Sequence, residues 1–267
     1  MGWQKEQPIV TLLVRDSAFL EKDKTVSSYP HGDFSYHNFR DCNIEKFKSS
    51  VEWLLEKNFF VVRMGKIMKK PLDIKHDSFL DYPFCETQND LFDIWLFANC
   101  EFCISTNSGP DLIPLYYNIP RLLVNALPLG LITRTGRDTI IPKRMTFADS
   151  GKELNLHQYL KANYLKSDDY NKANITIQEN SSSENLMYVK EFVNRLENKN
   201  VRQSDKQIMA REITKLYNII DGFQYHEFYN NQSVYSEEWL GTKDLDFFGN
   251  ESMPNEAKPI HNTLSYL

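Results

Sequence analysis

Residues 101–125 read EFCISTNSGPDLIPLYYNIPRLLVN, and this stretch decides the fold. A short apolar run at 102–104 ends at the polar sequence Thr106-Asn107-Ser108-Gly109. The pattern then predicts a helix over 110–117, and a second apolar run follows at 122–124. A strand, a loop, a helix and a second strand in this order are typical of a parallel sheet.

The loop of this unit is the first candidate for a functional site. In a parallel sheet, the loop after a strand lies at the carboxyl edge, where ligands bind, and the free N–H groups that open the next helix attract anions. Asn107, Ser108 and Gly109 occupy that position, so one interpretation is phosphate binding. Ser108 before Gly-Pro-Asp is equally an ordinary helix cap that needs no ligand, and both interpretations stay open.

The composition sets the class of protein. A chain of 267 residues with 41% hydrophobic content can bury the core of one large α/β domain or two small ones. Its net charge of −5 gives no basic footprint for nucleic acid, so any anion site must be local. No apolar run approaches the roughly 20 residues of a membrane span, and the first residues form no signal peptide. With only four cysteines, the sequence predicts a cytoplasmic protein.

Further apolar runs extend the sheet. Strands are expected at 9–14, 59–62 and 79–82, and helices at 44–55 and 89–98. Five strands with intervening helices or crossovers predict an α/β fold, a Rossmann-like doubly wound parallel sheet. No GxGxxG follows the first strand, which disfavours a dinucleotide cofactor. The helix at 89–98 is apolar nearly all round, which predicts that it is deeply packed.

The remaining chain is expected to cover this sheet. Residues 130–142 are expected to form a loop, two capping boxes at Ser181 and Ser204 begin amphipathic helices, and 223–259 are expected to wrap over the surface as an ordered tail. We therefore predict a Rossmann-like domain at 1–180, with C-terminal helices and a tail at 181–267 packed on the same domain.

Cationic residues gather near the predicted carboxyl edge. Arg15 and Arg63 follow strands, Arg40 ends the long loop after the first strand, and Lys143 follows the loop at 130–142. Guanidinium forks match phosphate oxygens, so several of them beside a helix start suit a diphosphate. Each arginine alone is also explained by a surface salt bridge, and their convergence is what favours an anion site.

The first long loop carries the candidates for a general base. Asp16, His31, Asp33 and His37 lie there, and each of them is also compatible with a purely structural role. The sequence shows no DxD-type metal pair at a fitting position, no Ser-His-Asp arrangement and no HExxH motif. It therefore predicts neither a metal nor a cofactor.

Five short motifs occur in a fixed order along the chain. They are VRDSAFL at 14–20, YHNFRD at 36–41 with Ile44-Glu45, VRMG at 62–65, Asp81-Tyr82, and STNSG at 105–109 with Asn125. In order and spacing they resemble a family of bacterial glycosyltransferases that are encoded with surface polysaccharide biosynthesis and are assigned the GT-B fold. The likeness runs from about Ile9 to the C-terminus and includes Ile141-Pro142-Lys143 and the segment 179–184.

This resemblance implies the C-terminal, donor-binding half of a GT-B enzyme. It implies a nucleotide-sugar donor and a glycan or lipid-linked acceptor, with peripheral association with assembly machinery at the inner face of the membrane. A GT-B enzyme has two Rossmann-like domains with the active site between them. The family's relatives usually carry an additional segment before the counterpart of Ile9, so the resemblance also implies a missing N-terminal domain or a partner chain.

The expected reaction is a metal-independent glycosyl transfer. Arg15 and Arg63 would neutralise the departing diphosphate together with the turn at 107–109, and Asp16 or His37 would activate the acceptor hydroxyl. The residues expected to bind the donor are Arg40, Arg63, Gly65, Asp81, Tyr82, Thr106, Asn107, Ser108, Gly109 and Lys143. A non-catalytic module that binds a nucleotide or a partner protein, and a sugar-nucleotide epimerase, are the alternative functions.

Overall fold

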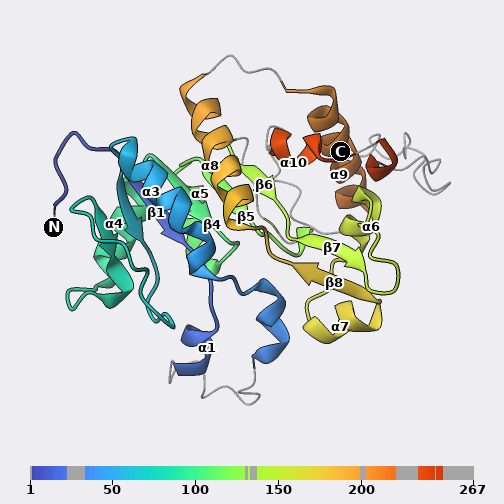
Figure 1. Cartoon of the computed structure of the whole chain (residues 1–267), viewed down its shortest axis with the longest axis horizontal. Helices are drawn as coiled ribbons and strands as arrows, with labels where there is room; N and C mark the ends of the chain where they lie inside the picture. The colour runs from blue at the N-terminus through green and yellow to red at the C-terminus, as the bar shows by residue number, and fades with distance from the viewer. Residues whose placement is uncertain are drawn as a thin grey trace, which may run out of the picture.

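A parallel sheet runs through the centre of the molecule in the order β3-β2-β1-β4-β5-β6-β9 (Figure 1). This computed structural model describes residues 2–22, 34–129, 132, 137–198, 203–220, 234–243 and 245–248. The strands of this sheet are β1 (Ile9–Leu13), β2 (Phe60–Arg63), β3 (Phe79–Asp81), β4 (Phe102–Ser105), β5 (Arg121–Val124), β6 (Thr139–Ile141) and β9 (Val234–Tyr235). All neighbouring pairs are parallel, which confirms the predicted α/β, Rossmann-like fold class.

Helices and a small hairpin complete the fold. The α-helices are α1 (Ala18–Lys22), α3 (Lys48–Glu56), α4 (Asp90–Asn99), α5 (Leu112–Tyr116), α6 (Leu156–Lys161), α7 (Ser167–Lys172), α8 (Ser182–Glu197), α9 (Asp205–Ile220) and α10 (Glu237–Gly241). The 3-10 helices are η1 (Ser35–Arg40), η2 (Ile44–Phe47), η3 (Tyr82–Phe84), η4 (Gly109–Asp111) and η7 (Leu245–Phe248). The strands β7 (Arg144–Phe147) and β8 (Ile175–Gln178) form a separate antiparallel pair.

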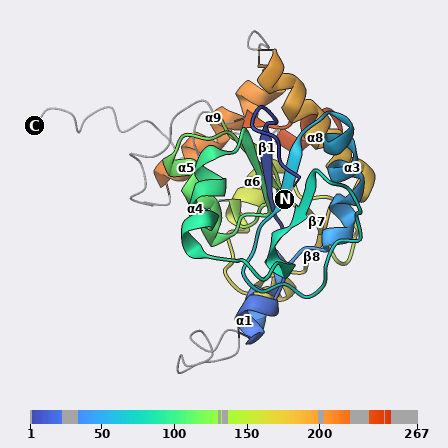
Figure 2. The same ribbon diagram turned by 90° about the vertical axis from the view of Figure 1, so that its left-hand side faces the viewer.

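Helices cover both faces of the sheet, as Figure 2 shows with α4 and α5 on one side of the strands and α3 and α8 on the other. The strand β1 explains this arrangement, because successive side chains of a strand point to opposite faces. Val10 and Leu12 belong to the larger core cluster, with α3 and α8, while Ile9 and Leu13 belong to the smaller one, with α4. Since both faces are apolar, the strand reads as a continuous hydrophobic run.

Several segments differ from the sequence-based expectation. The expected loop at 130–142 contains β6, and the expected surface tail contributes β9, α10 and the buried side chains of Trp239 and Leu240. The long first loop contains α1 and η1, and its residues 23–33, with the candidate bases His31 and Asp33, lie outside the described residues. β6 and β9 are too short to show a period in the sequence, so only their sheet partners reveal them.

The prediction that the helix at 89–98 is deeply packed was wrong. Within α4 only Leu96 and Phe97 are buried, whereas Leu91 is 78% exposed and Trp95 is 40% exposed. The described part of the chain therefore covers one side of a helix whose sequence is apolar on nearly every side.

Asparagine takes the left-handed backbone conformation at five positions in the described part of the chain, including Asn107 with a φ of 58° and Asn125 with a φ of 57°. Asn107 follows β4 and Asn125 follows β5. Asparagine tolerates this conformation better than most side chains do. The two residues therefore turn the chain sharply at the carboxyl edge of the sheet.

Replacing Gly65 with alanine should lower the free energy of unfolding by about 1–2 kcal/mol. Gly65 has a φ of 142°, and an added Cβ would lie 2.0 Å from Cε of Met68. Chemical denaturation measures the change. Gly241→Ala is the matched control, since its Cβ would meet no atom within 4 Å. A Gly65→Ala variant as stable as the wild type would contradict this account of the turn.

Candidate functional site

The candidate site lies where the sheet order reverses direction. From β1 the chain passes first to β2 and β3 on one side and then to β4, β5 and β6 on the other, so the loops after β1 and β4 diverge at the carboxyl edge. In doubly wound sheets this switch point is the usual ligand site. The two loops are tied together there, because the backbone N–H of Arg15 donates to Thr106 Oγ1 at 2.9 Å.

Three cationic residues meet at this point, and we call Arg15, Arg40 and Lys143 the cationic cluster. Arg15 Nε donates to Asp41 Oδ1 at 3.0 Å, and Lys143 Nζ donates to the backbone carbonyl of Asp41 at 2.6 Å. Arg40 Nη2 donates to the backbone carbonyl of Asn107 at 2.5 Å. Three of the four cationic residues whose convergence was predicted are thus brought to one place, although they lie far apart in the sequence.

The cluster holds more positive charge than its nearest carboxylate neutralises. Burial, and then repulsion from Arg15, lowers the pKa of Arg40. Burial, followed by the charges of Arg15 and Arg40, lowers the pKa of His37 to about 4. Arg15 Nη2, Arg40 Nε and His37 Nδ1 are buried and have no hydrogen-bond partner among the described residues. A buried donor without a partner raises the free energy of the folded protein, and so does repulsion between like charges. A bound anion would lower both contributions.

The turn at Asn107, Ser108 and Gly109 has the geometry of a helix cap. The backbone N–H of Ser108 donates to Asp111 Oδ2 at 3.0 Å, and Ser105 Oγ donates to the same oxygen at 2.6 Å. The expected single helix is the 3-10 helix η4 followed by α5, which has only five residues. The capping interpretation thus accounts for this turn, and we base no anion site on the helix start.

The hydrogen bonds and ion pairs of Arg63, Asp81 and Tyr82 go to residues other than those of the cationic cluster. The Arg63 side chain is 0% exposed, and Arg63 pairs with Asp81 at 3.3 Å across the register of β2 and β3. The Arg63 guanidinium also donates to the carbonyl of Lys70 at 2.8 Å. The buried Tyr82 hydroxyl accepts the backbone N–H of Asn89 at 3.0 Å. In this structure these residues support the loop after β2 and the start of α4.

Asp16 is held by backbone donors. Its Oδ1 accepts the N–H of Ala18 at 2.9 Å, and its Oδ2 accepts the N–H of Lys69 at 3.0 Å. Gly65 begins the loop that contains Lys69, so both of these predicted site residues shape the loops after β1 and β2. Of the two candidate bases that are described, His37 feels the charges of Arg15 and Arg40, whereas both carboxylate oxygens of Asp16 accept backbone N–H groups.

A polar pocket of about 270 Å³ adjoins the cluster, and the sequence pointed to it only through the family likeness at 179–184. It is lined by Lys46, Arg144, Gln178, Glu179, Asn180, Ser181, Ser182 and Glu184. The N–H of Asn180 donates to Asn125 Oδ1 at 2.9 Å, and the N–H of Asn43 donates to Glu179 Oε2 at 3.1 Å.

Two buried amides have free donors, that of Asn180, which lines this polar pocket, and that of Asn125, which bonds to the backbone of Asn180. The Nδ2 groups of Asn125 and Asn180 have no hydrogen-bond partner in the described part of the chain. The residues Asp41 and Asn43 connect the pocket to the cationic cluster, because Asp41 contacts Arg15 and Lys143 while Asn43 contacts Glu179. The cationic cluster and the polar pocket are therefore neighbours. The signal that could have found the pocket is the Ser181 capping box directly after a strand.

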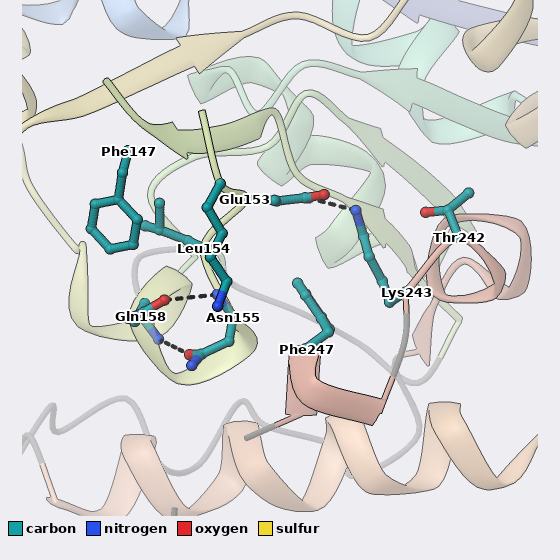
Figure 3. A pocket seen from close by; sticks show the side chains of 9 residues that line it. Phe147, Glu153, Leu154, Asn155, Gln158, Thr242, Lys243 and Phe247 are labelled. Carbon is teal, nitrogen blue, oxygen red and sulfur yellow. Dashed lines mark hydrogen bonds and ion pairs between the residues drawn. The ribbon is translucent and has the colours of Figure 1, made fainter. Parts of the chain in front are cut away.

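A second pocket of about 270 Å³ lies between the loop before α6 and the C-terminal segment (Figure 3). Figure 3 shows Glu153 and Lys243 pointing toward one another, with Nζ of Lys243 2.5 Å from Oε1 of Glu153. Asn155 and Gln158 bond to each other as the cap of α6. Since these polar groups satisfy one another, we interpret this pocket as a structural junction.

Two searches of the described residues concern metals and membranes. No group of three or more His, Cys, Asp or Glu side chains there could hold a metal ion. No helix in the same residues has both the length and the apolar character needed to cross a membrane. A scan against protein-family models and searches of the curated proteins and the solved structures find no match to this chain.

Proposed function

We propose that the chain binds a nucleoside diphosphate sugar at the carboxyl edge of its sheet and transfers the sugar to a polysaccharide or lipid-linked acceptor. The observation that supports this most directly is the cationic cluster, in which Arg15 and Arg40 repel one another and present unpaired buried donors. A diphosphate carries the charge and the oxygen spacing that two guanidinium groups match. Negative charge grows on the diphosphate as it leaves, so the same groups would stabilise the transition state.

The polar pocket supports a hydroxyl-bearing ligand beside the diphosphate. Its cations Lys46 and Arg144 are balanced by Glu179 and Glu184, so the pocket offers paired donors and acceptors and little net charge. The free amide donor of Asn180 adds a buried hydrogen-bonding group. The hydroxyl groups of a ribose or a sugar ring both donate and accept hydrogen bonds and suit such a pocket, whereas a second phosphate would need net positive charge.

His37 is the candidate that would activate the acceptor hydroxyl. With a pKa of about 4 it is neutral at pH 7 and can accept a proton, although a base this weak removes one poorly. The anionic donor would offset the charges of Arg15 and Arg40 and so raise this pKa. His37 would therefore become a better base when the donor is bound.

We expect the His37 ring to titrate near pH 4 in the free protein and at a higher pH with a nucleoside diphosphate bound. The physical reason is linkage: an anion that favours the protonated ring binds more tightly as the ring is protonated. NMR titration of the histidine ring signals, assigned with His37→Gln, measures the shift. An unchanged titration under saturating ligand would place the ligand away from the cluster.

The function is tested with the full chain and a panel of nucleoside diphosphates and their sugar esters. Calorimetry should show binding of a nucleoside diphosphate that is tighter than binding of the corresponding monophosphate, and product analysis should show sugar transfer when acceptor is supplied. Binding without turnover would select the nucleotide-binding module. Conversion of the donor without acceptor would select the epimerase, and no binding at all would refute the proposal.

A further inference from the structure

One face of the molecule exposes an unusual number of large apolar side chains. We call it the α4–α5 face, because its members lie on α4, on and just after α5, and on the N-terminal segment that packs beside α4. The face consists of Trp3, Leu91, Ile94, Trp95, Leu112, Tyr116 and Tyr117. Helices α4 and α5 contact each other and form the outer layer on their side of the sheet (Figure 2).

The aromatic rings around Trp95 pack against one another. The rings of Trp3 and Trp95 meet edge to face with centroids 6.3 Å apart, and those of Phe92 and Trp95 stack with centroids 5.8 Å apart. Beside them lies an open hollow of about 620 Å³, lined by Thr87, Asn89, Leu91, Phe92 and Trp95. An ordered apolar surface with a hollow can receive a complementary side chain at little cost in entropy.

The apolar sequence of α4 also favours burial of its exposed side against another surface. A helix that is apolar nearly all round belongs in an interior, since each exposed apolar side chain forfeits the free energy of burial. The described chain buries Leu96 and Phe97 and leaves Leu91, Ile94 and Trp95 open. A partner that binds these side chains would therefore present an apolar surface of its own.

The size of the face fits one side of a stable dimer. Exposed fractions of 39–78% over its seven side chains correspond to roughly 700 Å² of apolar surface, taking about 150–250 Å² for each aromatic side chain. The largest patch on a monomer is ordinarily about 300–600 Å². One partner in a standard interface buries about 800 Å².

The charges around the α4–α5 face disfavour its binding to a membrane. The exposed carboxylates of Glu86, Asp90 and Glu101 border this face, and they would be repelled by anionic lipid. Lys66 lies 3.2 Å from Asp90, so the border carries both signs of charge. A surface that is apolar at its centre and carries both signs of charge at its rim can pair with a second copy of itself across a two-fold axis.

We propose that the α4–α5 face binds the same face of a second copy of this chain, forming a two-fold dimer with α4 at its centre. Each residue of a two-fold interface occurs twice, so one substitution acts on both sides. Leu91→Glu would bury two carboxylates in an apolar contact, and it should weaken dimerisation by about 100-fold or more. Leu91 is 78% exposed in the single chain, so this change should leave the fold intact.

Sedimentation velocity of the full chain over a range of concentrations tests the proposal. The wild type should be dimeric at micromolar concentration and Leu91→Glu monomeric, with unchanged circular dichroism. Ile208→Glu is the matched control, because Ile208 is 40% exposed on α9 and should leave the dimer intact. A monomeric wild type would overturn the proposal. The same holds for a monomer that binds vesicles of phosphatidylcholine and phosphatidylserine, because the face would then bind lipid. A dimer that survives Leu91→Glu, or is lost in Ile208→Glu, would overturn it as well.

Discussion

Replacing Arg121 with methionine is expected to lower the free energy of unfolding by about 3–5 kcal/mol, the largest effect on stability that the structure predicts. Arg121 is 1% exposed, and its guanidinium donates to the two carboxylate oxygens of Asp138 at 3.1 and 2.7 Å. Its Nη1 also donates to Oδ1 and to the backbone carbonyl of Asp111, both at 3.1 Å. Methionine fills similar space but leaves two buried carboxylates without their cation. Removal of one partner of a buried ion pair is far more costly than the net value of the pair.

Urea denaturation, followed by circular dichroism, measures the loss. The control is Arg144→Met, because the side chain of Arg144 is 44% exposed and pairs with Glu184 at 3.0 Å. An exposed pair of this kind contributes about 0–1 kcal/mol. Comparable losses in the two variants would contradict the assignment of Arg121 as a buried charge that ties the loop after β4 to the start of β6.

Replacing Arg15 with alanine is expected to abolish sugar transfer and to weaken nucleoside diphosphate binding by about 100-fold. The loss of two charge-assisted hydrogen bonds at about 1.5–3 kcal/mol each would account for this factor or more. Arg15→Lys keeps the charge but loses the fork, so it should recover part of the binding and little of the transfer. Calorimetry and product analysis measure the two effects separately.

The matched control for Arg15 is Arg211→Ala, since Arg211 lies on α9 and bonds to Gln203 at 2.8 Å. A second variant, Arg40→Ala, guards against indirect effects. Arg15→Ala also breaks the ion pair with Asp41, whereas Arg40 donates to the carbonyl of Asn107. Both cluster variants should lose binding while their melting temperatures stay near that of the control. Wild-type affinity in Arg15→Ala would remove Arg15 from the donor site.

The sequence was informative about secondary structure where apolar residues form a continuous run or an amphipathic spacing. The buried run of β1 and the amphipathic spacing of α8 predicted the sheet and one covering helix. The strands β6 and β9 have three and two residues, and they exist because a neighbouring strand offers hydrogen bonds. Such strands depend on contacts between segments distant in the sequence, which local patterns do not contain.

The candidate site also combines features that the local sequence indicates with features that depend on distant contacts. Arg15, Arg40 and Lys143 were expected to lie together because they come at or near the carboxyl ends of parallel strands, which share one edge, and the structure brings these three side chains to one place. Arg63 also ends a strand, but its register places it beside Asp81 and draws its guanidinium into the interior. The polar pocket combines η2, β7 and the start of α8, and no single stretch of sequence contains it.

The last strand of the sheet has a consequence for the order in which the molecule is assembled. The strand β9 pairs with β6, and Ile140 lies opposite Tyr235 although most of the C-terminal helices separate them in the sequence. During synthesis on the ribosome, β6 therefore stays at the edge of the sheet without this partner until the chain up to Tyr235 has emerged. Long-range pairing of this kind forms slowly and leaves an unpaired strand open to wrong partners. The nascent chain should thus be most prone to aggregate just before Val234 and Tyr235 reach their place.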